Sequence, residues 1–280
     1  LRIRSMYCMT TFTIISESVI GVALFSVSMI ISTLTTNSMG ISSTAYGKLL
    51  EDGKHKLLQN NFTKLLYFGI PLAAISITFA KPGLFVLNPI YEIAFLIVIV
   101  LTISAFFRNI NQTFSLYISG IDSVDKNPDA TSKDFIKSSL FRLQSIRIIY
   151  QIIYYLFLII GLLIIKQQTS EPLVLASYWA IVYLINDIPY AIHLYFTIKK
   201  KTDFGFEFKS ITKYCISGLG AFGFVYLLIE EYLVYTDNIF VMIPNLVLFT
   251  GIGITIYLGI TYIIDFRTRN LIKAILKEIK

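Results

Sequence analysis

The sequence predicts an all-α fold, a polytopic bundle of about seven transmembrane helices, and three observations predict it. Hydrophobic residues make up 55% of the 280 residues, the mean hydropathy is +0.71, and only 15% of the residues are charged. A soluble domain carries charge on about a quarter of its residues. The apolar residues also form runs long enough to cross a bilayer, which takes about 20 residues of helix. The alternation that marks membrane β-strands is absent from these runs.

Seven apolar segments are expected to span the membrane, within a single membrane domain that covers residues 1–280. They cover approximately 8–36, 65–84, 93–118, 143–165, 173–198, 214–235 and 239–264. Residues 267–280 carry lysines on one helical stripe and leucines and isoleucines on another. This pattern predicts an amphipathic cytoplasmic tail that lies at the membrane surface.

Basic residues are divided unequally between the two sides of the expected bundle. Nineteen of the 24 lysines and arginines lie in the connections on one side, at the start of segment 143–165 or in the tail after the last segment. Because basic loops stay on the cytoplasmic side, this side is expected to face the cytoplasm. We therefore expect a multi-pass protein of the cell (plasma) membrane with a cytoplasmic C-terminus. The net charge of +7 then reflects membrane topology and does not indicate nucleic-acid binding.

An odd number of spans places the start of the first segment on the outer face. No cleavable targeting segment explains how that start was translocated. We therefore expect the chain to be the C-terminal part of a longer protein, with the missing N-terminal spans as its partner. A natural seven-helix protein, such as a receptor or a retinal-binding protein, is the alternative. A retinal protein needs a lysine in its last helix, and segment 239–264 has none.

Polar groups at membrane depth are the candidates for function, because burying them in lipid is costly and they normally face the bundle interior or a cavity. One helical face of segment 93–118 carries five of them, Ser104, Arg108, Asn111, Gln112 and Ser115. This spacing predicts a polar stripe that faces other helices.

Two further segments carry stripes that complement this one. Segment 173–198 has Tyr183, Asn186, Asp187 and Tyr190 on or near one face, and segment 143–165 begins with Arg147, Tyr150, Gln151 and Tyr154. Pro189 removes a helical hydrogen bond close to Asp187 and exposes backbone carbonyls there. A break at this depth is typical of a binding site.

Arg108 has two interpretations. It can neutralise Asp187 in a buried pair that fixes helix packing. Alternatively it can present positive charge, with Lys81 or Arg147, to an anionic headgroup or phosphate, since a guanidinium matches phosphate bidentately. The substrate-binding hypothesis therefore comprises Arg108, Lys81, Asn111, Gln112 and Arg147. Lys81 can also snorkel to the headgroups. Glu17 and Asp187 are the candidates for ion coupling or a buried pair.

No enzyme motif is present. The sequence lacks HExxH, a nucleophile elbow and a Walker loop, and it has two histidines. Four aspartates lie close together in one connection, Asp122, Asp125, Asp129 and Asp134, but lysines are interleaved with them, which favours a solvated turn over a metal site. Cys8 and Cys215 have no metal-ligand spacing and are interpreted as packing residues. We expect no catalytic activity, no metal and no cofactor.

Several stretches resemble the polysaccharide flippase branch of the MOP exporter superfamily. They are YFGIPLAA over 67–74, LFVLNPIYEIA over 84–94, and a long apolar helix that ends in SGID over 119–122. The similarity is best over 18–122 and is topological beyond. Asn88 stands where that family usually has a glycine, and the turn over 32–38 lacks the usual proline.

The resemblance implies a C-terminal lobe like that of MOP and MATE proteins plus two extra helices, with the seven segments as spans eight to fourteen. It implies alternating access around a cationic cavity, which moves a lipid-linked oligosaccharide or polysaccharide repeat unit to the outer leaflet. Such transport is usually ion-coupled. Embedded positive charge would bind the phosphate of the cargo, and Glu17 would be a candidate coupling acid.

Two other classes remain open. One is a drug or metabolite antiporter of the same superfamily. The other is a non-transporting membrane protein of glycan assembly, which would need a large outer loop, whereas the longest outer connection has about eight residues. In every case the expected partners are membrane lipids and, for the flippase, the lipid-linked glycan. No nucleic-acid partner is expected.

Overall fold

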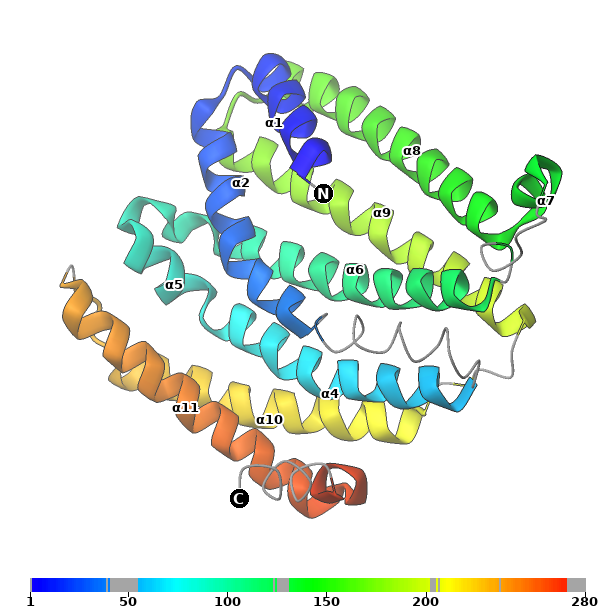
Figure 1. The fold of residues 1–280 in the computed structure, drawn as a ribbon. Helices are drawn as coiled ribbons and strands as arrows, with labels where there is room; N and C mark the ends of the chain where they lie inside the picture. The colour runs from blue at the N-terminus through cyan, green and yellow to red at the C-terminus, as the bar shows by residue number, and fades with distance from the viewer. Residues whose placement is uncertain are drawn as a thin grey trace.

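A computed structural model describes residues 2–38, 40, 55–122, 124, 131–201, 205, 207–236 and 238–270. Over these ranges the chain is helical, and no strand occurs in them. The elements are α1 (Arg2–Ser16), α2 (Val19–Ser32), η1 (Thr33–Ser38), α4 (His55–Thr78), α5 (Ala80–Leu87), η2 (Pro89–Ala94), α6 (Phe95–Ile121), α7 (Ser132–Lys137), α8 (Ser139–Gln168), α9 (Pro172–Lys201), α10 (Phe208–Tyr232) and α11 (Ile239–Ile264). Most of the long helices lie roughly side by side in one bundle (Figure 1).

Six helical stretches in the described part of the chain are long and apolar enough to cross a membrane, and a bent pair of helices makes a seventh. This confirms the predicted all-α polytopic bundle. The five expected segments from 93 to 264 correspond to α6, α8, α9, α10 and α11. Most of the expected amphipathic tail, residues 271–280, lies outside the described residues.

The first apolar segment is two helices instead of the single span expected over 8–36. Glu17 has φ 53°, in the left-handed region that only a few non-glycine residues adopt. Ser18 then begins α2, because its side chain accepts a hydrogen bond from the Gly21 N–H over 3.0 Å. The chain reverses here, and α1 packs against α2 and α8 (Figure 1). The turn at Glu17 therefore lies at the end of the bundle where α8 meets α9, the end at which the start of segment 8–36 was expected.

The second apolar segment is also bent. Between α4 and α5 the helix axis turns by 61° near Phe79, inside the span expected over 65–84. Pro82 is in the first turn of α5, where a proline costs no hydrogen bond. The Asn88 side chain accepts from the Ile90 N–H over 3.0 Å and begins η2. The bend keeps Lys81 and η2 together at this end of the bundle.

Two apolar cores hold the helices together. The first, the Trp179 core, joins α1, α2, α5, α6, α8 and α9. The Trp179 ring stacks on Phe25 and Phe12, with centroid distances of 3.7 and 4.7 Å, and its Nε1–H donates to the Tyr154 hydroxyl over 2.8 Å. This aromatic stack buries the only tryptophan of the chain.

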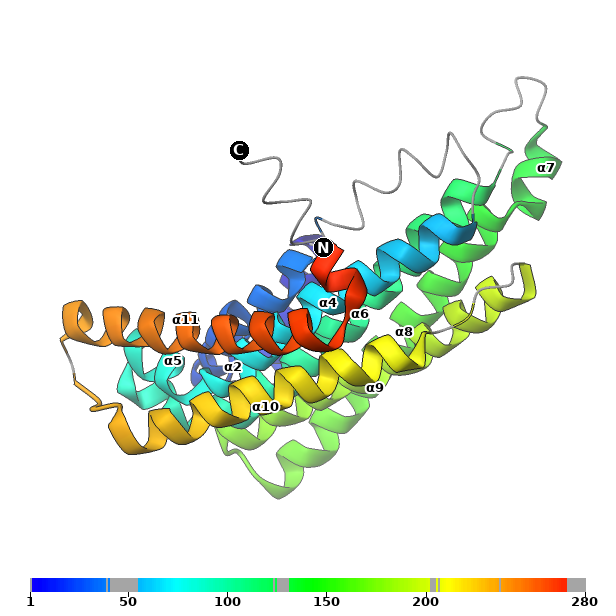
Figure 2. The same ribbon diagram turned by 90° about the horizontal axis from the view of Figure 1, so that it is seen from below.

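The second, the Tyr67 core, joins α4, α10 and α11 to the start of α8 and the later parts of α6 and α9. The Tyr67 ring packs 5.2 Å from Tyr214 and 5.6 Å from Tyr257, measured between centroids. The Tyr257 hydroxyl donates to the Tyr67 carbonyl over 2.8 Å. α10 and α11 form an antiparallel pair beside α4 (Figure 2). Both cores include α6 and α9, and these two helices pack against each other more extensively than any other pair of described elements, so they form the centre of the bundle.

Candidate functional site

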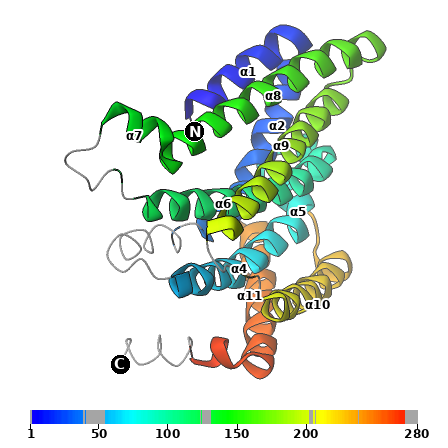
Figure 3. The same cartoon turned by 90° about the vertical axis from the view of Figure 1, so that its right-hand side faces the viewer.

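A cavity of about 610 Å³ lies between α6, α8 and α9. These three helices adjoin one another in the bundle (Figure 3). The lining side chains come from the three stripes predicted above and from their neighbours: Arg108, Asn111, Gln112, Ser115, Leu116 and Ser119 of α6, Leu143, Gln144, Arg147, Tyr150, Gln151 and Tyr155 of α8, and Asn186, Asp187 and Tyr190 of α9. The cavity thus runs along the second half of α6.

Asp187 is the carboxylate of this cavity, and it is buried. The Ser104 hydroxyl donates to Asp187 Oδ2 over 2.6 Å, and Arg108 Nε lies 3.6 Å from the same oxygen. Asn111 Nδ2 donates to the Asp187 backbone carbonyl over 3.0 Å. The polar stripe of α6 therefore docks directly on α9, as the complementary spacing of the two segments suggests.

The charge of Arg108 is neutralised by Asp187. Beyond its contact with Asp187, its Nη2 donates to Ser104 Oγ over 3.5 Å and its guanidinium lies 5.4 Å from the centroid of the Tyr183 ring. Only 25% of its side chain is exposed. Of the two interpretations drawn from the sequence, the structure contains the pair with Asp187.

Arg147 faces the same cavity from α8 and differs from Arg108 in its surroundings. Its side chain is exposed, and in the described part of the chain no carboxylate lies within 4.0 Å of it. The cavity therefore holds two guanidinium groups and one carboxylate. Arg147 supplies the positive charge that is not balanced by a neighbour.

Three polar atoms of the cavity residues are unfilled. Oδ1 of Asn111, Oδ1 of Asn186 and the hydroxyl oxygen of Tyr190 are buried and have no hydrogen-bond partner in the structure. A buried acceptor without a donor costs free energy, so such atoms are suited to a ligand or water that donates. The cavity thus offers a cation from Arg147 and acceptors from two asparagines.

Pro189 lies within α9, two residues after Asp187. The helix continues through it, and the Tyr150 hydroxyl of α8 donates to the Pro189 carbonyl over 3.4 Å. Tyr150 also packs on Tyr190, with ring centroids 5.1 Å apart. These contacts join α8 to α9 at the cavity wall.

Two of the predicted site residues lie away from the cavity. Lys81 Nζ is 3.6 Å from Glu92 Oε1, between α5 and η2, and does not line the cavity. Glu17 Oε1 is 2.9 Å from Lys166 Nζ and its side chain is 78% exposed. The hydrogen bond and the charge of Lys166 lower the pKa of Glu17. Neither residue belongs with Arg108, because each is paired at the end of the bundle where α8 meets α9.

The structure brings together Arg108, Asn111, Gln112, Arg147 and Asp187 from the predicted set. Sequence reasoning did not single out Gln144 and Ser119, which line the same cavity. Their spacing could have indicated them, because residues three or four apart share a helix face. Gln144 is three residues before Arg147, and Ser119 is four residues after Ser115.

Two aspartates of the connection after α6, Asp122 and Asp134, stabilise its local structure. Asp122 Oδ2 accepts from the Ser139 and Leu140 N–H groups over 2.6 and 3.1 Å. Burial alone would raise the pKa of Asp122, but these hydrogen bonds and that of Val124 outweigh it, so the pKa is lowered. Asp134 accepts from Thr131 in a capping box that begins α7. Asp125 and Asp129 lie outside the described residues.

The fold and the cavity define a multi-pass helical membrane protein, whose many apolar helices are compatible with a membrane transporter. A polar, cation-bearing cavity lies between three of its spans. Comparison of the chain with protein-family models, with curated proteins and with solved structures finds no match.

Proposed function

We propose that this protein moves a lipid-linked oligosaccharide or polysaccharide repeat unit across the plasma membrane by alternating access, as the C-terminal lobe of a MOP-type exporter. The observation that carries the proposal is the unbalanced guanidinium of Arg147 in a polar cavity between spans. Arg147 lies in the first third of the span-length helix α8, and a cation within a span is costly and commonly marks the path of a charged solute. The basic connections favour a cytoplasmic C-terminus and a cytoplasmic entry for the cargo.

The cavity chemistry matches a sugar phosphate. The Arg147 guanidinium can bind two phosphate oxygens at once. The free Oδ1 atoms of Asn111 and Asn186 accept hydrogen bonds, which sugar hydroxyls donate. A volume of about 610 Å³ accommodates a headgroup of a few rings, while the lipid tail stays in the bilayer.

The two arginines of the cavity have different roles. Arg108 positions α6 against α9 through Asp187, and Arg147 binds the phosphate. Lys81 has no part in binding, since it is paired with Glu92 outside the cavity.

Ion coupling, where it occurs, is assigned to Asp187. This carboxylate faces Arg108 directly and shares its cavity with Arg147, Tyr150 and Tyr190. A coupling cation bound to this carboxylate would compete with Arg108 for it and add positive charge to the cavity. Glu17 is exposed and bound to Lys166, so a cation bound there would leave the cavity unchanged.

The test is translocation of a fluorescent polyprenyl pyrophosphate that carries a short oligosaccharide, in proteoliposomes of the protein expressed from its complete gene. Arg147→Ala is expected to reduce the initial rate at least tenfold, and Arg147→Lys to restore part of it. Arg142→Ala is the control, because Arg142 is an exposed arginine of the same helix that does not line the cavity.

Equal rates in the Arg147→Ala and Arg142→Ala proteins would contradict the proposal. Uptake of a cationic drug, with no movement of the labelled glycan, would instead assign the protein to the antiporters.

A further inference from the structure

A second pocket lies at the other end of α4 from its bend, among α4, α10 and the chain after α11. Its volume is about 430 Å³. The lining residues are polar, basic or tyrosine: Asn60, Thr63, Lys64 and Tyr67 of α4, Tyr214 of α10, and Arg267, Thr268 and Asn270 after α11. None of these described lining residues carries a carboxylate. This headgroup pocket, as we name it, is separate from the cavity of Arg147.

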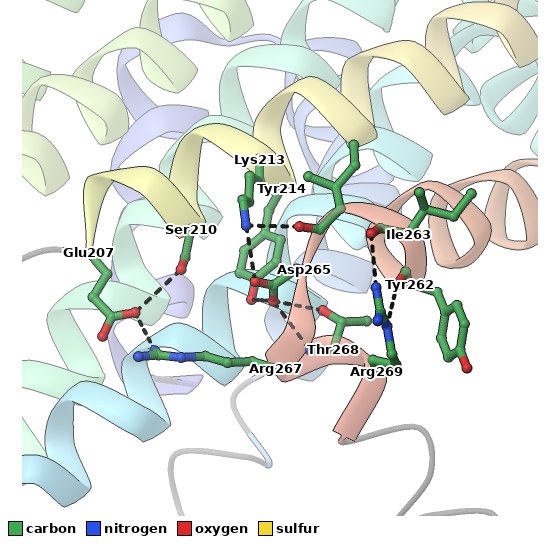
Figure 4. Close-up of polar contacts among 11 residues, drawn as sticks. Glu207, Ser210, Lys213, Tyr214, Tyr262, Ile263, Asp265, Arg267, Thr268 and Arg269 are labelled. Carbon is green, nitrogen blue, oxygen red and sulfur yellow. Dashed lines mark hydrogen bonds and ion pairs between the residues drawn. The ribbon is translucent and has the colours of Figure 1, made fainter.

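Asp265 joins the chain after α11 to α10 (Figure 4). Its Oδ2 accepts from the Tyr214 hydroxyl over 2.9 Å and from the N–H and hydroxyl of Thr268 over 3.2 and 3.1 Å. Lys213 Nζ lies 3.4 Å from Asp265 Oδ1 and donates to the Ile264 carbonyl over 2.9 Å. The buried aspartate thereby positions Arg267 and Asn270 at the pocket.

The charges around the headgroup pocket are not balanced. Asp265 is paired with Lys213, and Glu207 with Arg267 (Figure 4). Arg269 donates to the carbonyls of Tyr262 and Ile263. Within the part of the chain that the structure describes, Lys64 has no carboxylate within 4.0 Å. An excess of positive charge therefore stays at the pocket, next to amide donors from two asparagines.

Apolar side chains lie beside these basic groups. Phe266, next to Arg267, is 67% exposed, and Phe208, in the first turn of α10, is 71% exposed. Tyr262 packs against Arg269, with the guanidinium 5.6 Å from the ring centroid. A basic pocket with exposed aromatic rings at the end of membrane spans matches a phosphate joined to acyl chains.

We propose that the headgroup pocket binds the phosphate of an anionic phospholipid, with Lys64 as its principal cation. The Lys64 ammonium and the free N–H groups of Arg267 contact the phosphate oxygens, and the side-chain amides of Asn60 and Asn270 donate to them. Phe266 and Phe208 contact the acyl chains. The bound lipid joins α4 to the end of the α10–α11 pair.

The test is retention of lipid by the protein, measured by native mass spectrometry after release from nanodiscs of phosphatidylcholine with one-fifth phosphatidylglycerol. Wild type is expected to retain phosphatidylglycerol, and Lys64→Gln to retain at least threefold less. Lys199→Gln is the matched control, because it removes the same charge from an exposed position at the end of α9 and does not line the pocket. It is expected to retain as much as wild type.

A second variant, Asn60→Asp, adds a negative charge at an exposed position of the pocket and is expected to reduce retention by a similar factor. It replaces Lys64→Gln if that protein does not fold. Nanodiscs of phosphatidylcholine alone, with inorganic phosphate added, distinguish the source of the phosphate. Suppose that inorganic phosphate protects wild type against thermal unfolding while all variants retain equal amounts of lipid. That result would overturn the lipid assignment. Equal retention and no effect of phosphate would overturn the site itself.

Discussion

Ser104 and Asp187 are joined across α6 and α9 by a buried hydrogen bond of 2.6 Å. The same carboxylate oxygen faces Arg108, so a hydroxyl and a guanidinium of one helix face converge on one aspartate of its neighbour. This contact has two consequences. It fixes the packing of the two central helices, and it removes Arg108 from the cations available to a ligand.

Replacing Asp187 by asparagine is expected to destabilise the protein by about 1–3 kcal/mol, because the partly buried Arg108 then lacks a counter-charge. The free energy of unfolding in detergent measures this. Glu171→Gln, an exposed change just before α9, is the control and is expected to have little effect. The double variant that also carries Arg108→Gln is expected to lose less stability than the sum of the losses in the two single variants. Full additivity would contradict the pair.

Gly253 lets α11 approach α10 closely. A Cβ built at this position would lie 2.6 Å from the ring carbon Cε1 of the buried Phe222, whereas one at Gly251 would meet nothing within 4 Å. Gly253→Ala is expected to cost about 1–3 kcal/mol through this overpacking. Gly251→Ala is expected to be neutral or slightly stabilising, since alanine favours a helix. Similar melting temperatures for the two variants would show that α10 and α11 do not pack as described.

Asp265 makes the connection after α11 sensitive to acid. Burial alone would raise the pKa of Asp265, but hydrogen bonds from Tyr214, Thr268 and Lys213 outweigh it, so the pKa lies below its ordinary value of 3.8. A carboxylate with a lowered pKa stabilises the fold above the ordinary value and loses this contribution as the pH falls through the lowered one. Asp265→Asn is therefore expected to lower the melting temperature at pH 7. The difference from wild type should shrink below about pH 4, and a difference independent of pH would contradict the assignment.

The bundle could be predicted from the sequence because each span shows its own apolar run. The break at Glu17 could not, because the apolar run over 8–36 continues on both sides of it and a left-handed residue leaves no periodic pattern. The bend near Phe79 was missed for a similar reason, since the apolar pattern continues through it.

The candidate site was predictable where its residues share a helix face. Arg108, Asn111 and Gln112 follow helical spacing, and so they reach one cavity. The charge of Lys81 suggests binding beside Arg108, and the charge of Glu17 suggests ion coupling, but charge within an apolar segment does not show where a side chain lies. Their partners, Glu92 and Lys166, come from other elements, and only the folded chain brings them near. Asn109 gave no signal either, although it donates to Thr35 and Ser38 and so fixes η1 on α6.

In the proposed function, the glycan phosphate enters the cavity between α6, α8 and α9. The most direct measurement is labelling of Gln112→Cys by a charged, membrane-impermeant thiol reagent in native vesicles, with and without the polyprenyl pyrophosphate oligosaccharide. We expect this cysteine to be labelled and the substrate to slow the labelling at least fivefold. Ile148→Cys, on an exposed apolar position of α8, is expected to stay unlabelled in lipid. Labelling of the cavity cysteine at one rate, whether or not the substrate is present, would contradict the account.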